Sequence, residues 1–109
     1  MNNLRNQVQL IGHLGKNVDI KELESGRKVA TASIATKDIY QNKKGEKVVE
    51  TQWHKIIGWG KNATNMESFL SKGKEVAIRG KLTYRKFNDK NGVTRYYTEV
   101  VVNELLLVN

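Results

Sequence analysis

The chain of 109 residues contains no cysteine and no proline. The lack of cysteine excludes a disulfide scaffold, a cysteine nucleophile and a thiolate metal site. The N-terminus has no basic segment followed by an apolar one, so the sequence predicts no signal peptide. No apolar run approaches the ~20 residues that a membrane-spanning helix needs. We therefore expect residues 1–109 to form one soluble, cytoplasmic domain.

Acidic residues are fewer than basic ones. The chain has 11 Asp and Glu against 19 Lys and Arg, which gives a formal net charge of +8. A surplus of that size on a short chain favours a polyanionic partner, either nucleic acid or an anionic membrane surface. A domain this small buries a modest core and often gains stability by forming oligomers.

Most of the chain alternates apolar and polar residues with a period of two, which predicts strands. Only one segment has helical spacing, formed by Ala63, Met66, Phe69 and Leu70. We expect Asn62 to cap its start and Gly73 to stop it. The predicted strands cover 8–14, a short segment at 18–23, 27–40, 47–59, 76–87 and 93–108.

Three long strands therefore precede one short helix, and two long strands follow it. This is the element order of an all-β, five-stranded OB-fold barrel with a helix between the third and fourth strands. Closing the sheet into a barrel would also remove its exposed edges. An SH3-like barrel or a sandwich remains the alternative.

Two predicted strands carry aromatic and basic residues on one face, because side chains two apart point the same way. Trp53, Lys55 and Trp59 share a face of the third long strand. Arg85 and Phe87 share a face of the fourth, with Arg79 and Lys81. Rings that stack on unpaired bases and cations that follow the phosphates suit single-stranded nucleic acid. Tyr40, before a basic loop, is a further candidate ring.

A core position is the alternative for these rings. Tryptophan in a small domain is more often core, and Ile57 shares the parity of Trp53. Phe87 differs because its neighbours of the same parity are cations, and burying unpaired charge is costly. We therefore expect Phe87 to be exposed or to lie at an interface.

The sequence supports no enzymatic site. None of the four Gly-Lys pairs is followed by Ser or Thr, so the chain has no phosphate-binding P-loop. His13 and His54 have no second ligand at metal-binding spacing. No carboxylate pair stands out as an acid/base couple. We expect no catalysis, no metal and no cofactor.

Several segments, in order and at the right spacing, resemble bacterial single-stranded DNA-binding proteins of the homotetrameric OB-fold type. The resemblance runs nearly end to end. The matching segments are Asn-Gln-Val-Gln-Leu-Ile-Gly-His-Leu-Gly at 6–15, Ala-Ser-Ile-Ala-Thr at 32–36, Thr-Gln-Trp-His-Lys-Ile-Ile at 51–57, Gly-Lys at 60–61, Leu-Ser-Lys-Gly at 70–73, Gly-Lys-Leu at 80–82 and Arg-Tyr-Tyr-Thr-Glu-Val-Val-Val at 95–102.

The resemblance implies roles for particular residues. It moves Trp53 from a core position to a stacking platform. Position 40 is more familiar as Trp and position 59 as Phe, and both changes keep a ring. The implied base-stacking residues are Tyr40, Trp53, Trp59 and Phe87; the implied phosphate contacts are Lys43, Lys55, Lys61, Lys72, Arg85 and Lys86; the implied oligomer contacts are His54, Val8 and Leu10.

The function implied by the resemblance is to coat and protect single-stranded DNA, without sequence preference, in replication, recombination and repair. A homotetramer and a nucleoid-associated location are implied with it. The family's acidic, Pro-containing tail does not follow the last predicted strand, so this sequence does not support recruitment of replication and repair proteins. Two alternatives remain: a dimeric, tail-less primosomal accessory protein, and a basic barrel that binds structured RNA or another protein.

Overall fold

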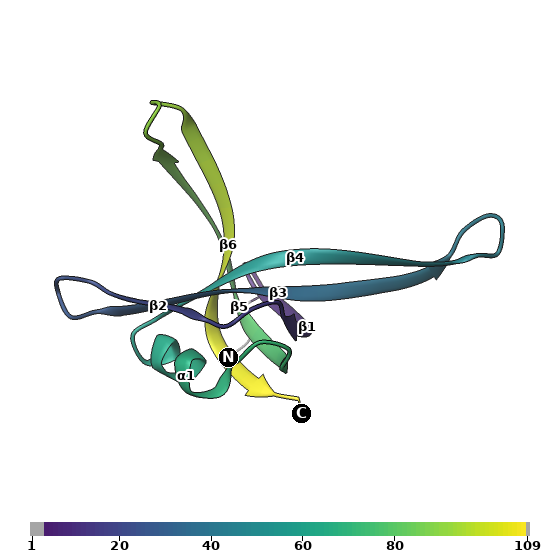
Figure 1. Ribbon diagram of the computed structural model, residues 1–109, viewed down its shortest axis with the longest axis horizontal. Coiled ribbons are helices and arrows are strands. Elements are labelled where there is room, and N and C mark those ends of the chain that lie inside the picture. The colour runs from purple at the N-terminus through teal and green to yellow at the C-terminus, as the bar shows by residue number, and fades with distance from the viewer. Residues whose placement is uncertain (1–3, 109) are drawn as a thin grey trace.

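The computed structural model describes residues 4–108 (Figure 1). It contains six strands and one helix. In chain order these are β1 (Val8–Leu14), β2 (Asp19–Glu22), β3 (Lys28–Gln41), β4 (Lys47–Trp59), α1 (Lys61–Phe69), β5 (Glu75–Asn88) and β6 (Thr94–Leu107).

The strands form one sheet that closes on itself. Their order is β1-β5-β6-β4-β3-β2, and β1 also pairs with β3 through His13–Ala35 and Leu14–Ile34. β4 and β6 run parallel, and β2 extends the sheet beside β3. The result is a closed five-stranded barrel with α1 between the third and fourth long strands. The predicted OB-fold is confirmed.

The core fills the closed part of the barrel. Ile34, Ile56 and Ile78 point inward from three strands, and Met66 packs against them from α1. Gly12 lies where β1 passes from β5 to β3, and a methyl group there would overlap the backbone oxygen of Ala35. Glycine at this position therefore permits the close approach that completes the barrel.

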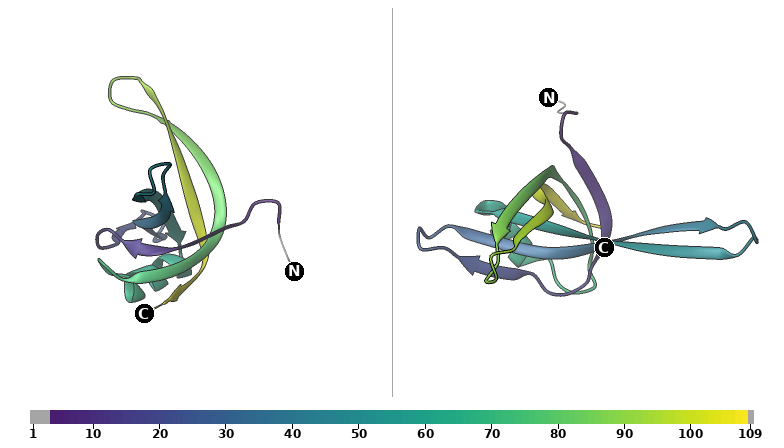
Figure 2. Two further views of the ribbon diagram at one scale, coloured as in Figure 1. Left: turned by 90° about the vertical axis from the view of Figure 1, so that its right-hand side faces the viewer. Right: turned by 90° about the horizontal axis from the view of Figure 1, so that it is seen from above.

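The long strands extend beyond the core as two arms. The β3–β4 hairpin projects to one side and the β5–β6 hairpin to another (Figures 1 and 2). All five residues from Lys37 to Gln41 at the end of β3 are exposed, as are those from Tyr84 to Asn88 in β5. The radius of gyration is 16.0 Å, against about 13 Å for a compact domain of this length.

The predicted strand bounds are confirmed to within a residue or two, whereas the helix signals were partly wrong. Gly60, with φ of 58°, occupies the N-cap position, and no side chain caps the helix. The helix ends at Phe69 with Leu70 extended, so Gly73 lies in the following turn. A bulge opposite Arg79 and Gly80 was not predicted. Within residues 4–108, no helix is long and apolar enough to cross a membrane.

One half of β3 lies in the core and the other half in the arm. The same Ile→Ala change should therefore lower the free energy of unfolding by different amounts in the two halves. Ile34 is fully buried, whereas Ile39 on the same strand is exposed. Ile34→Ala should lower the free energy of unfolding by ~2–5 kcal/mol. Ile39→Ala should change it by less than about 0.5 kcal/mol. Urea denaturation of both variants measures this, and equal losses would contradict the division.

Candidate nucleic-acid interface

A groove of about 220 Å³ opens on the outer face of the barrel, where β4, β6 and β5 lie side by side. Ile57 and Trp59 line it from β4, and Thr83 and Arg85 from β5. The Arg27 guanidinium lies 4.6 Å from the Trp59 ring centroid, a cation–π contact. The parity that the sequence predicted is confirmed, because Trp59 lines the outer groove and Ile56, which has the opposite parity, faces the core.

Trp53 lies further out on the same face of β4. Its side chain is 61% exposed, so the interpretation of Trp53 as a core residue was wrong. The indole lies against Gly15, where a methyl group would stand 2.5 Å from Cζ3 of the ring. Gly15 therefore allows the ring to lie against the backbone while most of its surface stays open to solvent.

Tyr40 lies on the β3–β4 arm but belongs to the other face of the ribbon. The register pairs Ala35 with Trp53 and Tyr40 with Val48, which gives Trp53 and Tyr40 opposite parity. The Tyr40 phenol donates a hydrogen bond to Glu50 Oε1 over 2.9 Å. This bond and the charge of Glu50 raise the pKa of Tyr40. The half-exposed ring is thereby anchored at its hydroxyl end.

Phe87 lies on the outer face of the β5–β6 arm and stacks on Tyr97. The two ring centroids are 4.9 Å apart and the planes differ by 12°. The ammonium of Lys55 lies 4.5 Å from the Tyr97 centroid, and the guanidinium of Arg85 lies 5.5 Å from it. Phe87 is 39% exposed, so the prediction that it lies outside the core is confirmed.

Tyr97 and Glu99 were missed as parts of this site. Glu99 is buried and forms ion pairs with Lys55 and Arg85. The only sequence signal was parity, since both residues share one face of the last strand with Val101. That signal does not show which residues of β4 and β5 lie beside them.

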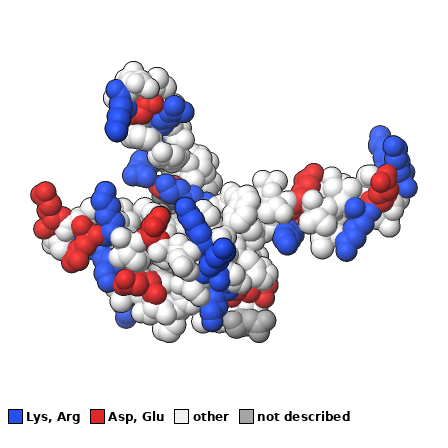
Figure 3. Space-filling view, viewed as in Figure 1, with Lys and Arg blue, Asp and Glu red and all other residues white. Residues whose placement is uncertain are grey.

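The other predicted phosphate contacts are spread over the surface. Lys43 lies in the β3–β4 turn, Lys61 begins α1 and Lys72 lies in the loop before β5. Lys86 has the opposite parity to Phe87 and lies on the other face of the arm. Figure 3 shows Lys and Arg at both arm tips and on the barrel between them, with acidic residues interspersed.

The face of the β5–β6 arm that carries Lys86 also holds two tyrosines. Tyr84 is 74% exposed and Tyr96 is 75% exposed. Tyr84 shares the parity of the core residue Ile78, but the strand has left the core at this point. These rings are additional exposed aromatic surface that sequence reasoning did not single out.

The predicted oligomer contacts occupy different surroundings. Val8 and Leu10 pack their side chains against the core. His54 is partly buried, and its Nε2 lies 2.8 Å from the Thr36 hydroxyl in a hydrogen bond. Any contact that Val8 and Leu10 make with a second copy would therefore use the backbone edge of β1.

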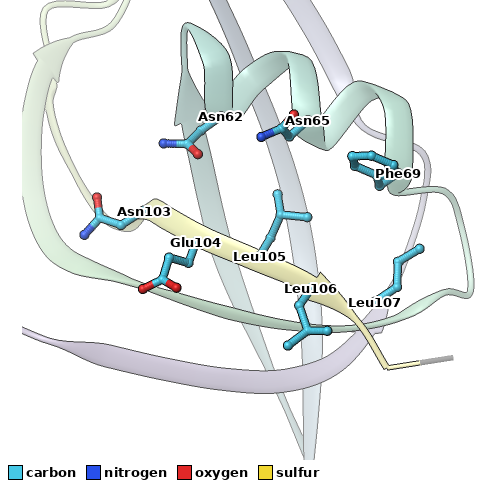
Figure 4. A pocket seen from close by; sticks show the side chains of 8 residues that line it. All are labelled: Asn62, Asn65, Phe69, Asn103, Glu104, Leu105, Leu106 and Leu107. Carbon is cyan, nitrogen blue, oxygen red and sulfur yellow. The ribbon is translucent and has the colours of Figure 1, made fainter.

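A larger hollow of about 450 Å³ lies between α1 and β6, away from the arms (Figure 4). Asn62, Asn65 and Phe69 line it from the helix. Glu104 is the only charged residue among the eight that line it. A pocket with this charge does not suit a phosphate backbone, so the outer groove and the arms remain the candidate interface.

A closed barrel with an outer groove of rings and cations defines an OB-fold of the kind that binds oligonucleotides or oligosaccharides. Residues 5–108 match the single-strand binding protein family. The chain belongs to that family.

Two relatives are each 36% identical to this chain over the aligned residues. Single-stranded DNA-binding protein 1 of Chlorobaculum tepidum matches over 104 residues, which are 94% of this chain and 64% of that protein. Single-stranded DNA-binding protein 1 of Xylella fastidiosa matches over 104 residues, 94% of this chain and 76% of that protein. The chain thus spans slightly less than two thirds of the first relative.

Solved structures show the same fold. The SSB of Plasmodium falciparum, in complex with ssDNA, superposes with a TM-score of 0.87 and 32% identity over all of both chains. A deletion mutant of the single-stranded DNA binding protein from Thermus aquaticus gives a TM-score of 0.82. Its identity is 24%, over 95% of this chain and 50% of that one, so it supports the fold alone.

The contact between Gly15 and Trp53 can be tested by fluorescence. In a Trp59→Phe background Trp53 is the only tryptophan. Adding Gly15→Ala should push the ring into solvent and move its emission to longer wavelength. The free energy of unfolding should change by less than about 1 kcal/mol. Lys16→Ala is the control, and an unchanged emission in Gly15→Ala would contradict the contact.

Proposed function

We propose that this chain binds single-stranded DNA with little sequence preference and protects it in replication, recombination and repair, without catalysis. One observation carries the proposal: exposed rings interleaved with cations run from the groove at Trp59 onto both arms. The names of the two relatives and the ssDNA complex of the similar structure support it. A nucleoid-associated location would follow from this activity.

Stacking supplies the part of the affinity that does not depend on salt. Each base stacked on an aromatic ring contributes ~1–3 kcal/mol, and every base offers a flat face. This makes binding tolerant of sequence. The proposed stacking residues are Tyr40, Trp53, Trp59 and Phe87.

Cations supply the part that depends on salt, because each phosphate neutralised releases counterions from the strand. Both arms carry cations beyond the barrel, so they extend the basic surface along which a strand could run (Figure 3). Within residues 4–108, the proposed phosphate contacts that form no ion pair are Lys43, Lys61, Lys72 and Lys86. Lys55 and Arg85 lie on the same path but are already paired with Glu99.

A tryptophan-fluorescence titration with oligo-dT tests the proposal directly. We expect strong, saturable quenching at low salt, a complex that persists at high salt, and weak binding of a duplex of the same length. If the chain binds duplex equally well, or if the complex dissociates at high salt, binding depends on the basic surface alone and the stacking assignments are wrong. Tighter binding of folded RNA than of oligo-dT would favour the RNA-binding alternative.

Replacing Trp53 tests the assignment of a single ring. Trp53→Ala should weaken oligo-dT binding by about 5- to 150-fold, the equivalent of ~1–3 kcal/mol of stacking. Phe69→Ala is the matched control, because Phe69 is an exposed ring on α1, away from the arms. Fluorescence anisotropy of labelled oligo-dT measures both variants. If the two lose affinity equally, stacking on Trp53 is not the cause.

We further propose that the chain assembles as a homotetramer. Val8–Gly12 of β1 pairs with β5 but not with β3, which leaves one backbone edge of that stretch without a strand partner in residues 4–108. Ile11 and Leu106 are exposed and line a hollow of about 320 Å³ on the outer face of β1, β5 and β6. An open edge and an apolar face together allow two kinds of contact with further copies.

Sedimentation equilibrium should give four times the 12.4 kDa of one chain. Ile11→Glu places a charge in the apolar face and should leave dimers paired through the β1 edge. Ile39→Glu, an equivalent change on the exposed part of the β3–β4 arm, should leave the mass unchanged. A dimeric wild-type protein would instead favour the primosomal alternative.

A further inference from the structure

Glu99 is the only buried charged residue among residues 4–108, with 3% of its surface exposed. A buried carboxylate is costly unless cations compensate for it. Two do so here: Glu99 Oε2 lies 3.3 Å from Lys55 Nζ and 3.2 Å from Arg85 Nη2. The three residues come from β6, β4 and β5, so one carboxylate ties together the strands that form the outer groove.

The same two cations also contact the ring of Tyr97. Lys55 lies 4.5 Å and Arg85 5.5 Å from its centroid. Tyr97 in turn stacks on Phe87. A continuous set of contacts therefore leads from the Glu99 carboxylate, through two shared cations, to a pair of stacked rings on the arm.

We propose that Glu99 is a positioning residue, which holds Lys55 and Arg85 against Tyr97 so that Tyr97 and Phe87 form one prearranged base-stacking platform. This inference rests on the proposed function. It adds Tyr97 to the residues that bind bases. It also removes Lys55 and Arg85 from the proposed phosphate contacts, because both charges are already paired with Glu99.

The two assignments of Lys55 and Arg85 differ in their salt dependence. Each cation that neutralises a phosphate of a single strand steepens the plot of log affinity against log salt by about 0.7. Cations held by Glu99 add little to that slope. Removing the carboxylate charge frees both of them, so the slope should become steeper while the platform loses its support.

The test compares the full chain with its Glu99→Gln variant, using labelled oligo-dT over a range of salt. Glutamine keeps the size of the side chain and removes only the charge. We expect the slope of Glu99→Gln to be steeper by up to about 1.4, two freed cations at 0.7 each. At about 1 M salt, where charges are screened beyond about 3 Å, binding should be about 5- to 150-fold weaker, as for one lost base stack.

Tyr97→Ala tests the ring without changing any charge. Its affinity should fall by a similar factor at high salt, with the wild-type slope retained. If Glu99→Gln does not fold, Tyr97→Ala still tests whether Tyr97 belongs to the base-stacking platform. Glu67→Gln is the control for removing an ion-paired carboxylate, since Glu67 pairs with Lys28 on the helix side of the barrel.

These measurements distinguish failure of the proposed ssDNA binding from failure of the positioning role of Glu99. If the wild-type chain does not bind oligo-dT, the proposed function fails. If it binds and folded Glu99→Gln keeps the wild-type slope, Lys55 and Arg85 already contact phosphates and the positioning role is wrong. If Tyr97→Ala binds normally at high salt, Tyr97 is not part of the platform.

Discussion

The whole arrangement depends on β1 pairing with two strands at once. It runs along β5 over Val8–His13 and reaches β3 at His13 and Leu14, and Gly12 permits the close passage between them. This contact converts a sheet into a barrel and seals the core. It also fixes the two directions in which the β3–β4 and β5–β6 hairpins leave the barrel (Figure 2). The placement of every ring on the arms follows from that closure.

The exposure of the rings is a consequence of strand length. A five-stranded barrel has a narrow interior, and its core here ends near Ile34 on β3 and Leu82 on β5. Both strands continue beyond those points, away from the core, and the residues at their far ends are exposed. Apolar and aromatic side chains there stay in contact with water, at a cost in hydration free energy. A ligand that covers them recovers this free energy, which links the shape of the arms to the proposed stacking.

The sequence predicted what depends on one strand and missed what depends on the pairing of several. Alternation located β3, β4 and the outward face of Trp59, and the cations around Phe87 correctly indicated a position outside the core. The frequency of tryptophan in small cores wrongly favoured a core position for Trp53, because the pattern of β4 does not show which of its two faces points away from the core. Tyr97 and Glu99 escaped notice because their partners come from β4 and β5. Those neighbours follow from the sheet order and register, which are set by tertiary pairing.

Glu99 shows why a count of cations overstates the charge available to a polyanion. Lys55 and Arg85 contribute fully to the formal charge of +8, yet both lie against one buried carboxylate. A charge so paired attracts a phosphate weakly, because binding would have to break an ion pair that offsets the burial of Glu99. The same pairing holds the rings of Tyr97 and Phe87 in a fixed arrangement before any base arrives, which reduces the ordering cost of binding. In this part of the surface, the positive charges of Lys55 and Arg85 position the aromatic rings of Tyr97 and Phe87. The rings, and not the charges, then contact the ligand.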